Sequence, residues 1–132
     1  MTIALTCTAV LAALVFVLGF NVSRLRGVVG KAGGSQLPID PADRLFVAIR
    51  AHGNAAEYVP TLILLFLLVA LRVPAWWTAA LIIAATAARL LHAAGMLAGG
   101  NLAKESIPRM IGAAGTYLFG TALAVVLLVS LW

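Results

Sequence analysis

The sequence predicts an all-α fold, a four-transmembrane-helix bundle, and three observations support this. Hydrophobic residues make up 64% of the 132 positions and charged residues only 10%, against about 45–50% and about 25% in soluble domains. The apolar residues form long continuous runs, each close to the roughly 20 residues that cross a bilayer. The runs do not alternate between apolar and polar residues, which disfavours a transmembrane β-barrel. We expect one integral-membrane domain over residues 1–132.

The composition also excludes several classes of protein. A disordered chain needs low hydrophobicity and high charge, which is the opposite of this sequence. The only cysteine, Cys7, rules out an internal disulfide. Two histidines and no thiolate cluster give no zinc pattern, so we expect no metal. The net charge of +5 suggests contact with anionic lipid headgroups or an acidic ligand rather than with nucleic acid.

The first helix is expected over about residues 2–23, because Met1 to Ser23 contains no charged residue. This run is not typical of a cleaved signal peptide, since cations follow it instead of preceding it and it is too long. We interpret it as a retained helix. Residues 24–44 contain four glycines and two prolines, which predicts a long loop.

The second and third helices are expected over about residues 43–71 and 74–98. Asp40-Pro41 and Asp43 together would form a cap at the start of the second helix. The tight connection at residues 72–74 makes the two helices a hairpin. The fourth helix is expected over about residues 107–131, after a short connection that contains Gly99 and Gly100.

Small residues recur every four positions in the third and fourth helices. This spacing allows two helix backbones to approach closely, although a composition rich in alanine and glycine explains it equally well. The positions are Ala80, Ala84 and Ala88 in the third helix and Gly112, Thr116 and Gly120 in the fourth.

The distribution of cations predicts the orientation in the membrane. The first and third connections carry most of the Lys and Arg residues, whereas the second carries only Arg72. The positive-inside rule therefore places loops one and three in the cytoplasm and both termini outside. Trp76, Trp77 and Trp132 would then be anchors at the outer interface. The cations at the cytoplasmic end are Arg24, Arg26, Lys31, Arg44, Lys104 and Arg109.

The densest polar group inside an apolar run lies near the start of the second helix. Arg50, Asn54 and Glu57 are spaced i, i+4, i+7 and share one helix face. Polar groups at membrane depth are costly and commonly functional. An Arg50–Glu57 pair that neutralises itself and locks helices together is the structural alternative, but it leaves Asn54 and His52 unexplained. We expect His52 to point elsewhere, towards a neighbouring chain.

Three further polar residues lie at the same end of the predicted bundle: Arg89 and His92 in the third helix, and Arg109 at the start of the fourth. Each also has a purely structural interpretation. Arg89 could extend its side chain to the lipid headgroups, His92 could be a histidine that only packs between helices, and Arg109 could contact headgroups at the cytoplasmic interface. Together with the second-helix group, however, several half-buried arginines and one carboxylate suit a small zwitterion with excess negative charge. Arginine forks would hold its carboxylates, and Glu57 would meet its amine.

The sequence of residues 50–60, Arg-Ala-His-Gly-Asn-Ala-Ala-Glu-Tyr-Val-Pro, resembles the signature of the MAPEG family, the membrane-associated proteins in eicosanoid and glutathione metabolism. Residues 88–92, Ala-Arg-Leu-Leu-His, resemble the family's third-helix motif, and residues 24–26, Arg-Leu-Arg, resemble the basic end of its first helix. The resemblance covers nearly the whole chain and is strongest to bacterial inner-membrane members.

The resemblance implies a homotrimer in the bacterial inner membrane, with glutathione bound between subunits at the cytosolic end. It implies a membrane-bound glutathione transferase, or a peroxidase, that activates the glutathione thiolate and conjugates it to a lipophilic electrophile arriving from the lipid. Arg109 would be the catalytic residue that stabilises the thiolate. The implied glutathione-binding residues are Arg24, Arg50, His52, Asn54, Glu57, Tyr58, Arg89 and His92.

Two positions depart from the family pattern. Met96 stands where many members have a tyrosine, and Met110 stands where the prostaglandin E synthase has a serine, so eicosanoid synthesis is not expected. One alternative is a non-catalytic trimeric member that binds lipid or a partner protein, since a fold does not prove an activity. Another is a small multidrug transporter, which the lack of a carboxylate in the first helix disfavours.

Overall fold

The computed structural model describes all 132 residues and contains four helices and no strand. Each helix is long and apolar enough to cross a membrane, which confirms the predicted all-α bundle of four membrane-spanning helices. The helices are α1 (Thr2–Lys31), α2 (Arg44–Arg72), α3 (Trp76–Gly99) and α4 (Ile107–Val129).

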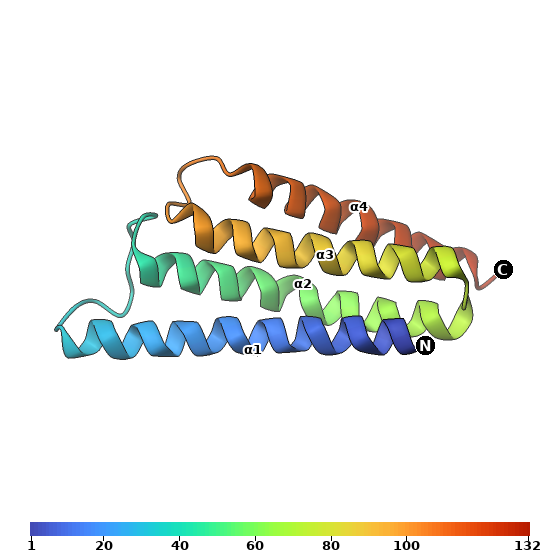
Figure 1. Ribbon diagram of the computed structural model, residues 1–132, viewed down its shortest axis with the longest axis horizontal. Coiled ribbons are helices and arrows are strands. Elements are labelled where there is room, and N and C mark those ends of the chain that lie inside the picture. The colour runs from blue at the N-terminus through green and yellow to red at the C-terminus, as the bar shows by residue number, and fades with distance from the viewer.

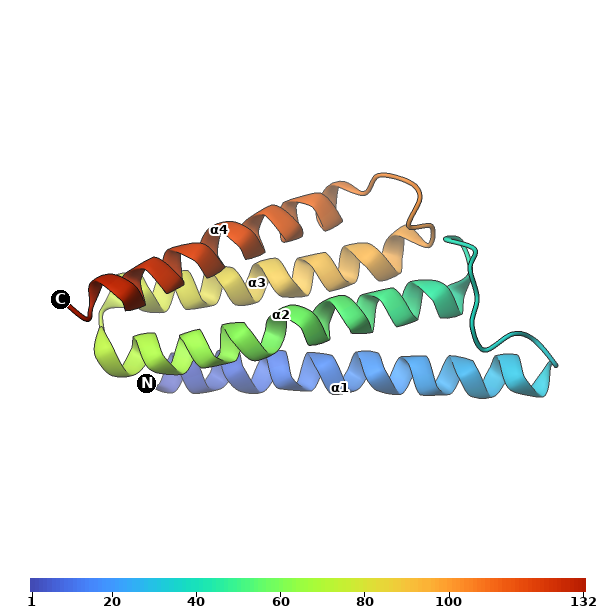
Figure 2. The same cartoon turned by 180° about the vertical axis from the view of Figure 1, so that it is seen from behind.

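The helices run alternately up and down, so both termini lie at one end of the bundle and the first and third connections at the other (Figure 1). Helix α3 packs against all three other helices, whereas α1 and α4 do not touch. The view from behind shows the same order of helices and shows α4 diverging from α2 towards the end that carries the two connections (Figure 2). We call this the loop end.

Helix α1 is longer than the sequence predicts. It continues to Lys31, so Arg24 and Arg26 lie on the helix and the first connection is residues 32–43. Gly27 and Gly30 favour a loop in the sequence, but an isolated helical glycine costs only about 1 kcal/mol. Leu25 remains buried, in a small apolar cluster with Leu45 of α2, and this packing sustains the extra turns. The bounds of the other helices differ from the expected ones by at most two residues.

Two local features fix the loop end. The Asp43 carboxylate accepts hydrogen bonds from the backbone N–H groups of Leu45 (2.7 Å) and Phe46 (3.1 Å), so it caps α2 as the sequence predicts. The backbone N–H of Leu102 donates to the carbonyl of Pro41 at 2.9 Å. This bond joins the first connection to the third and holds the two segments together above α2 and α3.

Helices α3 and α4 approach closely, but not along the whole predicted stripe. A Cβ on Gly112 would overlap the backbone of His92, and one on Gly115 would lie 2.9 Å from the Cβ of Ala88. Ala80, by contrast, is exposed, and Gly120 faces Leu62 of α2. The prediction is wrong at these two positions because four residues turn a helix by about 400°, which is about 40° more than one full turn. Over two repeats the side chain therefore rotates by about 80° and no longer faces the same neighbouring helix.

Candidate functional site

The side chain of Arg89 lies inside the bundle and is only 2% exposed. Its Nη2 donates to Oδ1 of Asn54 at 2.8 Å, and its guanidinium carbon lies 5.1 Å from the centroid of the Tyr58 ring, a cation–π geometry. Its Nε is buried without a partner. The interpretation of Arg89 as a headgroup contact is therefore wrong, because α2 supplies both an acceptor and a ring within the bundle.

A tyrosine pair extends this contact to α4. The hydroxyl groups of Tyr58 and Tyr117 are 3.2 Å apart, and the ring centroids are 5.8 Å apart. Arg89, Tyr58 and Tyr117 thus form a continuous polar path across three helices. Tyr117 is not among the site residues that the sequence predicts. One feature of the sequence could have indicated Tyr117. Both tyrosines of the chain lie in apolar runs, where a tyrosine hydroxyl usually needs a hydrogen-bond partner.

Replacing Asn54 by leucine is expected to destabilise the apo protein by about 2 kcal/mol, since a hydrogen bond to a buried cation is lost. Unfolding in detergent without added ligand measures this. The matched control is Asn101→Ala: the Asn101 side chain accepts a bond from Ala103 in the exposed third connection, so its loss should be clearly smaller. Equal losses in both variants would contradict the structural role of Asn54.

Arg50 and Glu57 lie on the outer edge of α2, and both are exposed in the single chain. An exposed pair on one helix does not lock two helices together, so the structure gives no support to the self-neutralising alternative. The cation and the carboxylate instead flank the half-buried Asn54. One edge of α2 therefore presents a positive and a negative group, each about one turn from Asn54, the residue that bonds Arg89.

His52 points away from the face of α2 that carries Arg50, as the sequence predicts. It packs against α1 of the same chain, where its Nε2 lies 3.1 Å from the position that a Cβ on Gly19 would take. A position two residues after Arg50 is turned by about 200°, and α1 covers part of that side. That His52 also faces a neighbouring chain stays a prediction. Gly19 provides the room for the imidazole.

His92 and Arg109 form a second group, between α3 and the start of α4. Nδ1 of His92 lies 2.8 Å from the backbone carbonyl of Arg109, so this nitrogen carries a proton and donates it. The Arg109 guanidinium donates to the carbonyls of Leu102 (3.2 Å) and Lys104 (2.9 Å). His92 thus fixes the backbone of Arg109, while the third connection fixes its side chain.

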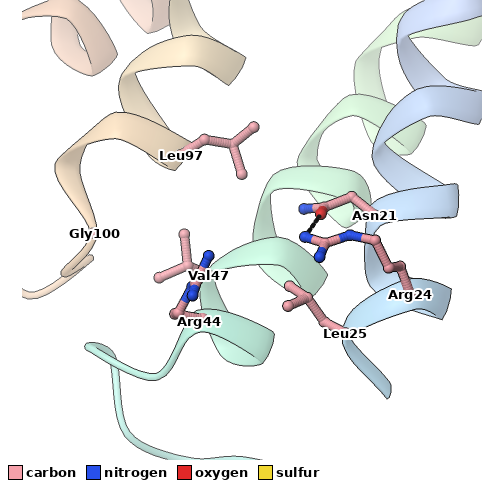
Figure 3. A pocket seen from close by; sticks show the side chains of 7 residues that line it. All are labelled: Asn21, Arg24, Leu25, Arg44, Val47, Leu97 and Gly100. Atoms are coloured by element: carbon pink, nitrogen blue, oxygen red, sulfur yellow. Dashed lines mark hydrogen bonds between the residues drawn. The ribbon is translucent and has the colours of Figure 1, made fainter. Parts of the chain in front are cut away.

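Arg24 lies apart from the other candidate residues. Its Nη2 donates to Oδ1 of Asn21 at 2.9 Å, and it lines a pocket of about 430 Å³ between α1, α2 and α3 (Figure 3). None of the other predicted site residues lines this pocket. A single chain therefore joins Asn54, Tyr58 and Arg89 directly, places Arg50 and Glu57 beside them, and leaves Arg24 and His52 on the α1 side.

Comparison with known proteins bears on the whole chain. The family model described as the MAPEG family matches residues 4–129, a range that includes every candidate residue named above. A search of curated proteins and a search of solved structures gave no match.

Proposed function

Because the chain belongs to the MAPEG family, we propose that it is a membrane-bound glutathione transferase that activates the glutathione thiol and conjugates it to a lipophilic electrophile. The family comprises membrane proteins of glutathione and eicosanoid metabolism. The observation that carries the proposal beyond family membership is the edge of α2. There Arg50 and Glu57 are exposed, each about one turn from Asn54, which bonds the buried Arg89. Charges of both signs are therefore open to a ligand.

These charges suit the chemistry of glutathione, which carries two carboxylates, one ammonium group and one thiol. Arg50 offers a planar fork for a carboxylate, and Glu57 offers an acceptor for the ammonium group. The buried Nε of Arg89 has no partner in the single chain, and a buried donor without an acceptor is costly. That nitrogen is closed off from solvent in the single chain, so Arg50 and Glu57 are the charged groups that a ligand can reach.

Arg109 is proposed to stabilise the thiolate, with His92 as its positioning residue. A free thiol has a pKa of about 8.5, and the thiolate is the nucleophile. A guanidinium has five N–H donors, so Arg109 can hold the third connection with two of its nitrogens and still face a sulfur atom. The thiol would lose its proton to water, and the thiolate would attack the electrophilic carbon and form the new C–S bond. As that bond forms, the bond to the leaving group would break and the leaving group would depart with the electron pair. The electrophile would arrive from the lipid, so it needs no aqueous path.

We further propose a homotrimer in a bacterial inner membrane, with the loop end in the cytoplasm. The cations gathered at that end support this orientation, and Arg72 is the only Lys or Arg in the connection at the other end. The position of Arg24 supports a role for the neighbouring subunit. Within one chain Arg24 does not reach the α2 edge, so only a second copy could bring it to glutathione.

An ultraviolet difference titration of the purified protein in detergent with glutathione tests the function. We expect a saturable thiolate absorbance at neutral pH. If the oligomer is intact and no such signal develops, the protein does not activate glutathione. The non-catalytic interpretation, a trimer that binds lipid or a partner protein, would then replace the transferase.

Replacing Arg109 by alanine is expected to raise the pKa of the bound thiol by about one unit, equivalent to about 1.4 kcal/mol, while some glutathione binding remains. The pH dependence of the conjugation rate measures this. The matched control is Lys104→Ala, since Lys104 contributes its backbone carbonyl to Arg109 and its side chain is exposed. An unchanged pH–rate profile for the Arg109 variant would reject Arg109 as the thiolate stabiliser.

A further inference from the structure

A groove of about 240 Å³ lies between α2 and α4. Both helices begin at the loop end (Figure 2). Tyr58 and Tyr117 line the part of the groove nearer that end, whereas Leu65 and Ala124 line the part farther from it. The groove therefore starts at the tyrosine pair and continues along the two helices towards the opposite end of the bundle.

The tyrosine pair has one O–H group that its own contact does not use. The two hydroxyls lie 3.2 Å apart and share one hydrogen bond, in which either oxygen can be the donor. Each phenol carries a single O–H, so one of the two O–H groups remains free to donate elsewhere. Both tyrosines line the groove, and Tyr117 is 57% exposed, so a ligand in the groove can reach this donor.

The depth of the tyrosines in the membrane restricts what can accept this hydrogen bond. Tyr58 and Tyr117 lie near the middle of two helices that are long and apolar enough to cross a bilayer. The hydrocarbon core holds no water that could accept the bond, and an unpaired hydroxyl there is costly. Thr61 and Thr121 add exposed hydroxyls to the same groove. The occupant must therefore dissolve in lipid and also carry an oxygen that accepts a hydrogen bond.

The groove adjoins both parts of the proposed glutathione site. Glu57 directly precedes Tyr58 on α2. On α4, Tyr117 follows Arg109 by eight residues, which is about 12 Å along the axis, and the side chains of one helix tilt in the same direction. With carbon–carbon bonds of about 1.5 Å, an extended zigzag chain covers this distance in about ten bonds.

We infer that the groove between α2 and α4 holds the lipophilic electrophile, and that Tyr117 is a specificity-determining residue. It selects electrophiles that carry a hydroxyl or carbonyl oxygen about ten bonds from the carbon that the thiolate attacks. The inference rests on the proposed transferase function, because it places the thiolate at Arg109. The rest of the groove would hold the remainder of the lipid chain.

Conjugation of three bromoalkanes to glutathione by the purified protein in detergent tests the inference. Bromodecanol has bromine and hydroxyl at opposite ends of its chain, bromodecane lacks the hydroxyl, and bromobutanol is too short to reach from Arg109 to Tyr117. Replacing Tyr117 by phenylalanine removes the O–H and keeps the ring. We expect the KM for bromodecanol to rise about fivefold, the effect of one hydrogen bond, and the KM values for the other two to stay unchanged.

The matched control is Thr86→Val, which also removes a hydroxyl from a membrane-spanning helix. The Thr86 hydroxyl donates to the carbonyl of Ile82 in its own helix, and Thr86 does not line the groove. All three KM values should equal those of the parent. The Tyr117 variant should still form an intact oligomer and give the thiolate absorbance with glutathione, since it keeps Arg109, Arg50 and Glu57.

Four outcomes would overturn the inference. An equal rise in KM for bromodecane and bromodecanol would mean that Tyr117 only shapes the groove. A rise for bromobutanol as well would mean that the oxygen is bound close to the reacting carbon. Dissociation of the oligomer in the Tyr117 variant would assign the groove to a second copy of the chain. A thiolate signal without conjugation of any bromoalkane would remove the electrophile groove and leave glutathione activation in place, whereas loss of that signal in the parent would remove the transferase function itself.

Discussion

Replacing Gly112 by alanine is expected to destabilise the bundle by about 3 kcal/mol, at the upper end of the usual cost of overpacking. The added Cβ would overlap the backbone nitrogen and Cα of His92 and lie 2.7 Å from its Cβ. Backbone atoms in a helix cannot turn aside as a flexible side chain can, so α3 and α4 must separate. This separation would also pull His92 away from the Arg109 carbonyl.

Thermal unfolding in detergent, followed by circular dichroism, measures the loss. Gly27→Ala is the matched control, since Gly27 is also helical and no atom lies within 4 Å of the position that a Cβ on it would take. Alanine there should be neutral or stabilise the helix by up to about 1 kcal/mol. Similar melting temperatures for the Gly112 variant and the parent would show that the α3–α4 contact is looser than described.

Replacing Arg50 by alanine is expected to lower the affinity for glutathione about a hundredfold, or by about 2.8 kcal/mol. The variant removes a two-point contact to a ligand carboxylate and leaves that carboxylate facing only Asn54 and the charge of Glu57. The loss of stability should be small, because the Arg50 side chain is exposed in the single chain.

Isothermal titration of glutathione into the detergent-solubilised protein measures the affinity. Arg26→Ala serves as the control, since it removes an exposed arginine from the same end of the bundle and changes the net charge equally. A hundredfold loss in the Arg50 variant alone would support the α2 edge as the surface that binds glutathione. Equal affinity of the Arg50 variant and the parent would remove Arg50 from the site.

The membrane-spanning architecture was predictable because it depends on the lengths of apolar runs, and these are explicit in the sequence. The end of α1 was not predictable in the same way. Two glycines and three cations made residues 24–31 resemble a loop, yet Leu25 finds a buried place against Leu45. The contact between Leu25 and Leu45 depends on where α2 packs against α1, and the sequence of residues 24–31 does not reveal this.

Within the candidate site, the sequence predicted which residues share a side of one helix but not which residues meet across helices. Helical spacing correctly gathered Asn54 with Arg50 and Glu57 on one side of α2. It did not reveal that Asn54 would bond Arg89, that Tyr117 would meet Tyr58, or that His52 would turn to α1. Each of these depends on how one helix is rotated relative to another, and spacing within a helix leaves that angle open.

The two connections at the loop end are constrained by a single residue. Leu102 donates its N–H to Pro41 and accepts a bond at its carbonyl from Arg109, so one peptide segment links the first connection to the guanidinium. Ordinary surface loops tolerate insertions and deletions independently of one another. Here a change of length in either connection would displace Leu102, whose carbonyl holds the Arg109 side chain. Among related proteins, the lengths of the two connections are therefore expected to change together.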